Sequence, residues 1–210
     1  MGLIKLLFSD PLLLVVLAVL LLYSIIAHEV AHGWVAYLFG DDTAMRRGRL
    51  TFNPVPHIDP LGVLMLFLVG FGWARPVPVN YSRFGNTRLG LFCVALAGCA
   101  TNILIAMGAI ILLQFDSVGA NPVFSVVLPI LIQINIILGA LNLIPLPPLD
   151  GSKILMSLLP NEAQMGFARL EPYGFFILVF LLFSGLLNPA IDFMQKLIYG
   201  FIALFLGIFK

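Results

Sequence analysis

Two histidines and a glutamate stand close together at the end of a long apolar run. His28, Glu29 and His32 form an H-E-x-x-H pattern, and residues 11–27 before it are almost continuously Leu, Val, Ile and Ala. On a helix, histidines four residues apart face the same way, one turn apart. This spacing suits two imidazoles on one zinc ion, with the glutamate free to act on a metal-bound water. The pattern therefore predicts part of a metal centre for hydrolysis.

The composition indicates a membrane protein. The chain has 210 residues, of which 61% are hydrophobic and only 10% charged, whereas a soluble globular protein carries about 25% charged residues. Ionisable side chains inside a membrane span are costly and usually functional, which favours a functional role for the H-E-x-x-H pattern. The net charge of +1 gives no sign of a nucleic-acid partner.

The apolar segments predict the helices that must position these residues. We expect transmembrane helices over about 11–39, 87–115 and 122–143, and a helical hairpin from 173–187 and 190–209. The first helix exceeds the ~20 residues that a span requires. Its excess length places the H-E-x-x-H turns near one membrane face.

Between the first two helices lie shorter elements. Residues 58–73 are apolar for only about 13 residues after Pro60, a length more typical of a re-entrant or interfacial segment than of a span. Residues 50–52 could form a short strand. Residues 74–81 alternate valine with proline, which suits either an edge strand able to pair with an unwound peptide or a plain extended linker.

Together these segments predict an all-α polytopic membrane protein. It would have about five transmembrane helices, one short re-entrant or interfacial segment and a small β element on the cytoplasmic side. We expect residues 1–160 to form the core with the chemistry, and residues 161–210 to form the C-terminal hairpin.

Positive charges predict the orientation. If 58–73 does not cross the membrane, nine Lys and Arg residues fall on one side and two on the other, which marks the first side as cytoplasmic and the N-terminus as outside. The first group is Arg46, Arg47, Arg49, Arg75, Arg83, Arg88, Lys153, Arg169 and Lys210, and the second is Lys5 and Lys196.

A catalytic zinc ion normally has three protein ligands, so one more is needed. Asp150 is the strongest candidate because it lies in the proline-broken stretch 145–151, where the helix over 122–143 returns to the cytoplasmic side. Broken backbone at membrane depth is tolerated where it lines a cavity. Asp150 could also cap a short helix over 152–159, and the two roles are compatible. His57 is interpreted as structural or interfacial, and Asp59 as a cap for the apolar segment after it.

The motifs resemble those of the site-2 protease family of intramembrane zinc metalloproteases. The resemblance rests on residues 28–32 and on 142–151, N-L-I-P-L-P-P-L-D-G, with further likeness at 48–54, 57–60 and 72–80. It implies one zinc ion per chain, bound by His28, His32 and Asp150, and a bacterial cell membrane as the location. It also implies that Asn142 stabilises the oxyanion of the reaction.

One residue differs from the family pattern. Cys99 stands where the family usually has a proline, which we expect to alter local helix geometry and to leave the metal site unchanged. The chain resembles the compact bacterial members, without PDZ or CBS domains.

The expected activity is hydrolysis of peptide bonds within or near the transmembrane segments of membrane proteins. Glu29 would act as the general base on zinc-activated water. Alternatives for single residues are a helix–helix hydrogen bond for Asn142 and interhelical bonds for Asn102, Gln133 and Asn135. Alternatives for the protein are a non-enzymatic scaffold with a structural zinc and a divalent-metal transporter.

Overall fold

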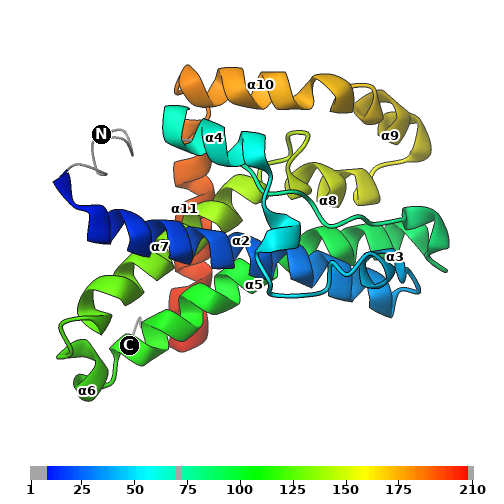
Figure 1. The fold of residues 1–210 in the computed structure, drawn as a ribbon. Coiled ribbons are helices and arrows are strands. Elements are labelled where there is room, and N and C mark those ends of the chain that lie inside the picture. Colours follow the sequence, from blue (N-terminus) through cyan, green and yellow to red (C-terminus); the bar gives the residue numbers. More distant parts are fainter. Residues whose placement is uncertain (1–8, 70–71, 208–210) are drawn as a thin grey trace.

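The computed structural model of the chain describes residues 9–69 and 72–207, and none of these forms a β-strand (Figure 1). Lys5 and Lys210, which count in the orientation argument, lie outside the described residues. In chain order the elements are α2 (Pro11–Leu38), α3 (Thr43–Arg46), the 3₁₀ turn η1 (Val55–His57), α4 (Pro60–Val69), the 3₁₀ turn η2 (Tyr81–Arg83), α5 (Thr87–Leu113), α6 (Asp116–Gly119), α7 (Phe124–Asn142), α8 (Asp150–Leu158), α9 (Asn161–Ala168), α10 (Glu171–Phe183) and α11 (Asn188–Leu206).

Four helices are long and apolar enough to cross a membrane, namely α2, α5, α7 and α11. A fifth candidate is the pair α9 and α10, whose axes are bent by 62° at the break between them. The prediction of an all-helical, multi-pass membrane protein is therefore confirmed, with four to five candidate spans. The predicted division of the chain at residue 160 stays a prediction.

Helix α2 carries the H-E-x-x-H pattern near its C-terminal end. The Asp10 side chain caps its start by accepting a hydrogen bond from the Leu13 N–H at 3.0 Å. Its 28 residues correspond to about 42 Å, well beyond the ~30 Å of a bilayer's hydrocarbon core. The chain turns away at Gly40, whose φ of 97° is a left-handed conformation that glycine adopts most readily.

Helix α5 packs along both α2 and α7, and these three helices form the centre of the molecule (Figure 1). Small side chains on α5 allow the close approach, as is usual between helices in lipid. The buried small residues of α5 are Gly90, Ala95, Gly98, Cys99, Ala106 and Ala109. The helix runs without interruption through Cys99.

Helix α11 closes the far side of this centre. Its Ile198 and Ile202 pack against Ala106 of α5 and against Ile136 and Ala140 of α7. In Figure 1 α11 crosses behind α5 and α7, and α10 lies above α4 at the top of the view. The rings of Trp73 and Phe175, whose centroids are 5.1 Å apart, join the chain after α4 to α10.

The apolar segment of α4 folds back on itself. Ten residues extend only about 15 Å, too short for a span. The Arg75 N–H donates to the His57 carbonyl at 2.8 Å, so the chain before α4 meets the chain after it. Asp59 caps α4, as predicted, by accepting from the Gly62 N–H at 2.9 Å. This geometry supports a re-entrant segment, although residues 70–71 within it lie outside the described part.

The predicted β element is not present among the described residues. No strand forms at 50–52, and directly after it the Asn53 N–H donates to the Thr51 side chain and the Val55 N–H to the Asn53 side chain, so the chain turns locally. Residues 74–80 are extended, but Pro76 and Pro78 have no N–H to donate to a neighbouring strand. The N–H groups of Arg75, Val77 and Asn80 donate to the His57 carbonyl and to the Glu29 and Asp41 carboxylates. The plain extended linker was the correct alternative.

Candidate metal centre

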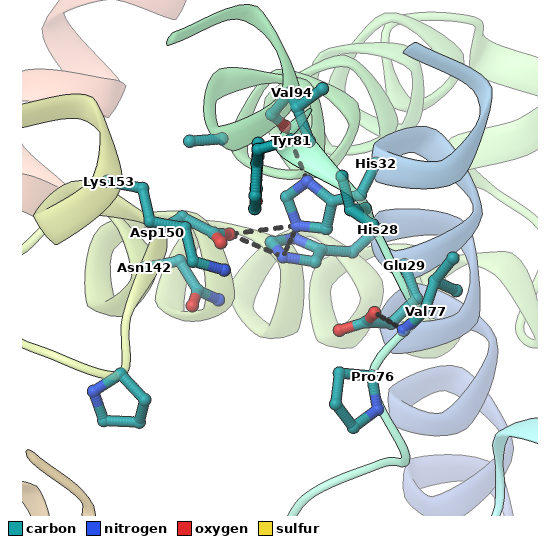
Figure 2. Close-up of a pocket in the computed structure, with 13 residues that line it drawn as sticks. His28, Glu29, His32, Pro76, Val77, Tyr81, Val94, Asn142, Asp150 and Lys153 are labelled. Carbon is teal, nitrogen blue, oxygen red and sulfur yellow. Dashed lines mark hydrogen bonds and ion pairs between the residues drawn. The ribbon is translucent and has the colours of Figure 1, made fainter. Parts of the chain in front are cut away.

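Three buried side chains from α2 and α8 converge on one point (Figure 2). The Asp150 Oδ2 atom lies 3.0 Å from His28 Nε2 and 3.1 Å from His32 Nε2. The two Nε2 atoms are 3.0 Å apart. Among the residues that the structure describes, these three form the one group of histidine, cysteine or acidic side chains positioned to hold a metal ion. The structure thus brings together the three predicted ligands, although His28 and Asp150 are 122 residues apart in the sequence.

Asp150 reaches this point because α7 and α8 meet at a tight connection. Helix α7 ends at Asn142, and Asp150 is the first residue of α8. A Cβ atom at Gly151 would clash with the Leu143 and Ile144 carbonyl oxygens, so glycine is what allows α8 to start there. The N-cap residue of α8 is Leu149 and no side chain caps the helix, so the alternative of Asp150 as the N-cap is wrong.

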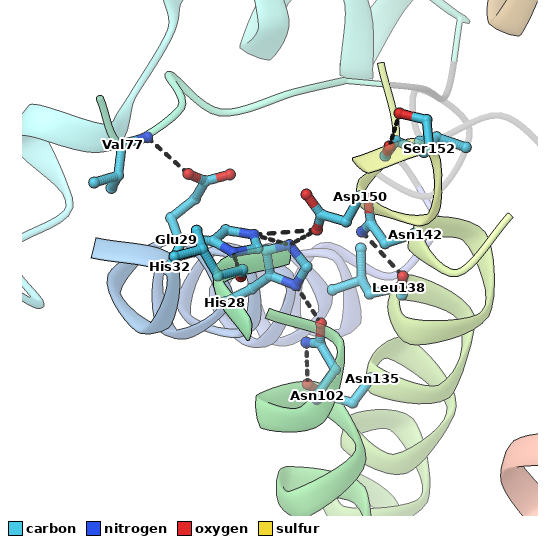
Figure 3. A network of polar contacts seen from close by, with 12 residues as sticks. His28, Glu29, His32, Val77, Asn102, Asn135, Leu138, Asn142, Asp150 and Ser152 are labelled. Atoms are coloured by element: carbon cyan, nitrogen blue, oxygen red, sulfur yellow. Dashed lines mark hydrogen bonds and ion pairs between the residues drawn. The ribbon is translucent and has the colours of Figure 1, made fainter. Parts of the chain in front are cut away.

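The outer nitrogens of both rings also have partners (Figure 3). His32 Nδ1 lies 2.6 Å from the Val94 carbonyl oxygen of α5, and His28 Nδ1 lies 2.6 Å from Asn102 Oδ1. A backbone carbonyl can only accept, so His32 Nδ1 carries the proton and the lone pair of His32 is on Nε2. This lone pair faces the other two candidate ligand atoms.

The donor set fits zinc. Two imidazoles and one carboxylate are common zinc ligands, and ligand atoms at about 2.0–2.1 Å in tetrahedral geometry would lie about 3.3 Å apart. The observed separations of 3.0–3.1 Å are close to this. Gly98 lets α5 pack closely against both rings, because a Cβ atom there would lie 2.5 Å from His28 Nε2 and 2.6 Å from His32 Nε2.

Glu29 lies beside the cluster, on the wall of the same pocket of about 330 Å³. Its Oε2 atom accepts a hydrogen bond from the Val77 N–H at 2.7 Å, which brings the extended segment 74–80 against α2. Gly33, one turn further along α2, permits this approach because a Cβ there would lie 3.0 Å from Val77 Cγ1. Among the described residues, only the Oε2 atom of the Glu29 carboxylate accepts a hydrogen bond.

Asn142, Tyr81 and Lys153 line the same pocket. One N–H of the Asn142 amide donates to the Leu138 carbonyl at 3.0 Å, which leaves its second N–H available. Burial would lower the pKa of Lys153, but the nearby Tyr81, Asp150 and Glu29 hold it above its ordinary value. Lys153 therefore brings a positive charge to the pocket at neutral pH.

His57 lies outside the cluster. It is fully buried, and its Nε2 donates to the Thr51 carbonyl at 2.9 Å, so it holds the loop before α4. Burial, and the nearby positive charge of Arg49, leave the pKa of His57 below its ordinary value. This geometry agrees with the structural interpretation of His57.

The sequence did not single out Val77, Tyr81 or Lys153. Lys153 follows Asp150 by three residues on one helix, and this spacing could have placed both on the same face. Val77 acts through its backbone N–H, which leaves no trace in a pattern of side chains. Tyr81 comes from a segment whose path depends on the loop around α4.

Comparison with known proteins identifies the family. The model of peptidase family M50 matches residues 116–185, which contain Asn142 and Asp150. "Putative zinc metalloprotease YwhC" of Bacillus subtilis is 40% identical over 181 residues, which cover 81% of each chain. The chain belongs to peptidase family M50.

Other members of the family are less similar. "Putative zinc metalloprotease Rip2" of Mycolicibacterium smegmatis is 33% identical over 172 residues, or 80% of this chain and 66% of that protein. "Zinc metalloprotease MJ0392" of Methanocaldococcus jannaschii is 27% identical over 147 residues, or 70% of this chain and 35% of that protein. No solved structure matches the chain significantly.

The predicted family, enzyme class and cofactor are thereby confirmed. The protein is a zinc metalloprotease of family M50 with several apolar helices suited to spanning a membrane. The individual roles of His28, Glu29, His32, Asn142 and Asp150 remain predictions at this point.

Proposed function

We propose that this M50 protease hydrolyses peptide bonds within or near transmembrane segments of membrane proteins, in regulated intramembrane proteolysis. The observation that carries the proposal is the position of the cluster. His28 and His32 lie inside an apolar helix of 28 residues, and their buried partner Asp150 stands where α7 ends. A catalytic centre at this place is suited to substrates in the membrane.

His28, His32 and Asp150 are the proposed ligands of one zinc ion per chain. Zinc held there would lower the pKa of a coordinated water toward ~7 and would polarise the scissile carbonyl group. Glu29 accepts the proton of the attacking water as the new C–O bond forms. It then delivers this proton to the amide nitrogen as the C–N bond breaks, so that a carboxylic acid and an amine result.

Two side chains are placed to oppose the negative charge that develops on the carbonyl oxygen. Within the described part of the chain, the bond to Leu138 uses one N–H of Asn142, and the second N–H is the proposed oxyanion donor. Lys153 adds a positive charge on the same pocket wall. The Leu138 carbonyl holds the Asn142 amide in place, so little reorganisation is needed during the reaction.

The proposed substrates are single-span membrane proteins, or the membrane stubs that an earlier cleavage leaves. A helical substrate must unwind locally, because helical hydrogen bonds occupy its carbonyl groups. In the proposed orientation the pocket opens toward the cytoplasm of a bacterial cell and the N-terminus lies outside. Nine positive charges against two support this orientation.

Two variants test the chemistry and separate its parts. Purified protein is assayed for cleavage of a model single-span substrate and for bound zinc. Glu29→Gln should lower the cleavage rate by about 10²–10⁴-fold, the usual effect of a general base, and keep one zinc per chain. Asp150→Ala should lose both activity and zinc.

Glu162→Gln is the matched control. Glu162 is exposed on α9 and is absent from the pocket, so this variant should keep both cleavage and zinc. Undiminished cleavage by Glu29→Gln would refute the mechanism, and full zinc content in Asp150→Ala would refute the ligand set.

A further inference from the structure

A chain of buried polar side chains runs from the metal centre into the helix core (Figure 3). Asn102 of α5, Asn135 of α7 and Ser24 of α2 are each at most 2% exposed. The sequence suggested that the two asparagines join helices, which they do. The directions of their hydrogen bonds carry further information about His28.

The far end of this chain is fixed by the backbone. Asn135 Nδ2 lies 2.9 Å from the Leu131 carbonyl oxygen and 2.9 Å from Ser24 Oγ. A carbonyl oxygen can only accept, so the amide nitrogen of Asn135 must face Leu131. The amide oxygen of Asn135 therefore faces the other way, toward Asn102.

This direction passes to the histidine. Asn102 Nδ2 donates to Asn135 Oδ1 at 2.8 Å, so Asn102 Oδ1 faces His28 Nδ1 at 2.6 Å. An amide oxygen only accepts, so the His28 proton must be on Nδ1 and its lone pair on Nε2. Nε2 is the atom that faces His32 and Asp150.

We propose that Asn102 and Asn135 are positioning residues that hold His28 in its metal-binding tautomer. The inference rests on the ligand role proposed above for His28. The Leu131 carbonyl orients Asn135, Asn135 orients Asn102, and Asn102 accepts the Nδ1 proton of His28. If the Asn102 amide turned over, its N–H would face Nδ1 and favour a proton on Nε2, where it would block metal binding.

Zinc affinity measured by competition with a chelator tests this role directly. Asn102→Leu removes the acceptor and should weaken zinc binding by about 10–100-fold, the usual effect of losing a partner of a metal-bound histidine. Asn102→Asp keeps an acceptor for the Nδ1 proton and loses only the donor to Asn135. It should bind zinc within about threefold of the wild type, in line with the common carboxylate–histidine–zinc arrangement.

A second variant acts at a distance from the histidine. Asn135→Leu leaves His28 and Asn102 in place but releases the amide of Asn102, so zinc binding should weaken by about 10-fold. The visible absorption spectrum of the cobalt-loaded protein should change in Asn102→Leu and Asn135→Leu, because the ring of His28 is no longer fixed. In Asn102→Asp it should stay close to that of the wild type.

Gln133→Leu is the control for loss of an interhelical hydrogen bond. Gln133 lies on α7 like Asn135, but it faces outward and accepts from the Tyr199 hydroxyl at 3.2 Å. Its replacement should leave zinc affinity and the cobalt spectrum unchanged. Thermal unfolding of each metal-free variant separates a loss of stability from a loss of metal binding.

The outcomes distinguish the inference from the proposed function. If the wild type and His28→Ala bind zinc equally, the proposed metal centre itself is refuted. If His28→Ala loses zinc while Asn102→Leu and Asn135→Leu keep wild-type affinity, the positioning role alone is refuted. An equal loss of zinc affinity in Asn102→Asp and Asn102→Leu would also refute the positioning role. Both losses would then result from disturbed packing between the helices and not from a missing acceptor for His28.

Discussion

Gly98 lets α5 pack closely against the proposed metal centre. It lies on α5 against the rings of His28 and His32, and a Cβ atom there would lie 2.5–2.6 Å from both Nε2 atoms. The same Cβ atom would lie 2.5 Å from His28 Cε1, so it would push the ring of His28 aside. A methyl group at this position therefore disturbs the approach of the two Nε2 atoms to each other.

The Gly98→Ala variant should therefore bind zinc at least about 100-fold more weakly than the wild type. This is the upper end of the loss in affinity that is usual when a metal site is disturbed. Bound zinc is measured by mass spectrometry of the purified variant and affinity by chelator competition. Cleavage of a model substrate should fall in proportion to the zinc lost.

Gly108→Ala is the matched control on the same helix. No heavy atom lies within 4 Å of a Cβ built at Gly108, so the same substitution there meets open space. It should keep zinc and activity, and it gains a little helix propensity. Full zinc affinity in Gly98→Ala would contradict the close packing of α5 against the two proposed ligand rings.

Among single residues, the sequence singled out His28, Glu29 and His32 because ionisable groups are rare in apolar helices, and Asp150 because it lies in a proline-broken stretch. The structure brings His28, His32 and Asp150 together, and their roles stay predictions. The link from His28 to Asn135 through Asn102 could not be predicted, because it depends on how α2, α5 and α7 rotate against one another. For the same reason the hydrogen bond from Val77 to Glu29 was not predicted.

The extended segment 74–80 is the element that joins α4 to the pocket. Three backbone N–H groups hold it, from Arg75 to the His57 carbonyl, from Val77 to Glu29 and from Asn80 to Asp41. The three acceptors, on His57, Glu29 and Asp41, lie in different parts of the chain. The segment therefore positions Val77 without the ladder of a β-sheet, which explains why the strand prediction was wrong.

Asp41 is the anchor that lies beyond the end of α2. Its carboxylate is fully buried and accepts from the Asn80 N–H at 2.6 Å and the Thr43 N–H at 3.0 Å. Burial raises the pKa of Asp41, but these hydrogen bonds, the Thr43 hydroxyl and Arg83 outweigh it and leave the pKa below 3.8. The charged form is thus favoured by folding.

Asp41→Asn should destabilise the protein by about 1–3 kcal/mol at neutral pH, because an amide N–H replaces an acceptor that faces buried donors. Since the folded pKa is depressed, the contribution of Asp41 is present above its ordinary pKa of 3.8 and is lost as pH falls through the folded value. The difference in unfolding temperature between wild type and variant should therefore shrink as the pH falls below 3.8. A difference that stays constant down to strongly acid pH would contradict this account.

At the scale of the element, the long helices could be predicted and the short ones were less certain. Continuous apolar runs predicted α2, α5 and α7 to within a few residues at most ends, because each must satisfy its own backbone hydrogen bonds in lipid. The fold-back of α4 was predicted from its length. The bend between α9 and α10 was not, because both segments lie near a polar stretch where no periodicity indicates direction.

At the scale of the whole molecule, many large apolar side chains of the described residues are exposed, while several polar side chains are buried. Leu12, Leu104, Phe180 and Leu204 are each more than 60% exposed, whereas His28, Asn102 and Asp150 are buried. This distribution is expected for helices in lipid, where apolar surfaces face the bilayer and buried polar groups serve function. The proposed zinc centre lies among these helices, which supports the proposal that its substrates are membrane proteins.

The central claim concerns where this M50 protease cuts. The most direct test is mass spectrometric mapping of the cleavage site in a model single-span substrate, incubated in lipid nanodiscs with wild type or with Glu29→Gln. We predict that the wild type yields new termini inside the transmembrane segment or within about one helical turn of its end, some 5.4 Å, and that Glu29→Gln yields none. Cleavage confined to the soluble part of the substrate, or the same termini from both enzymes, would contradict the account.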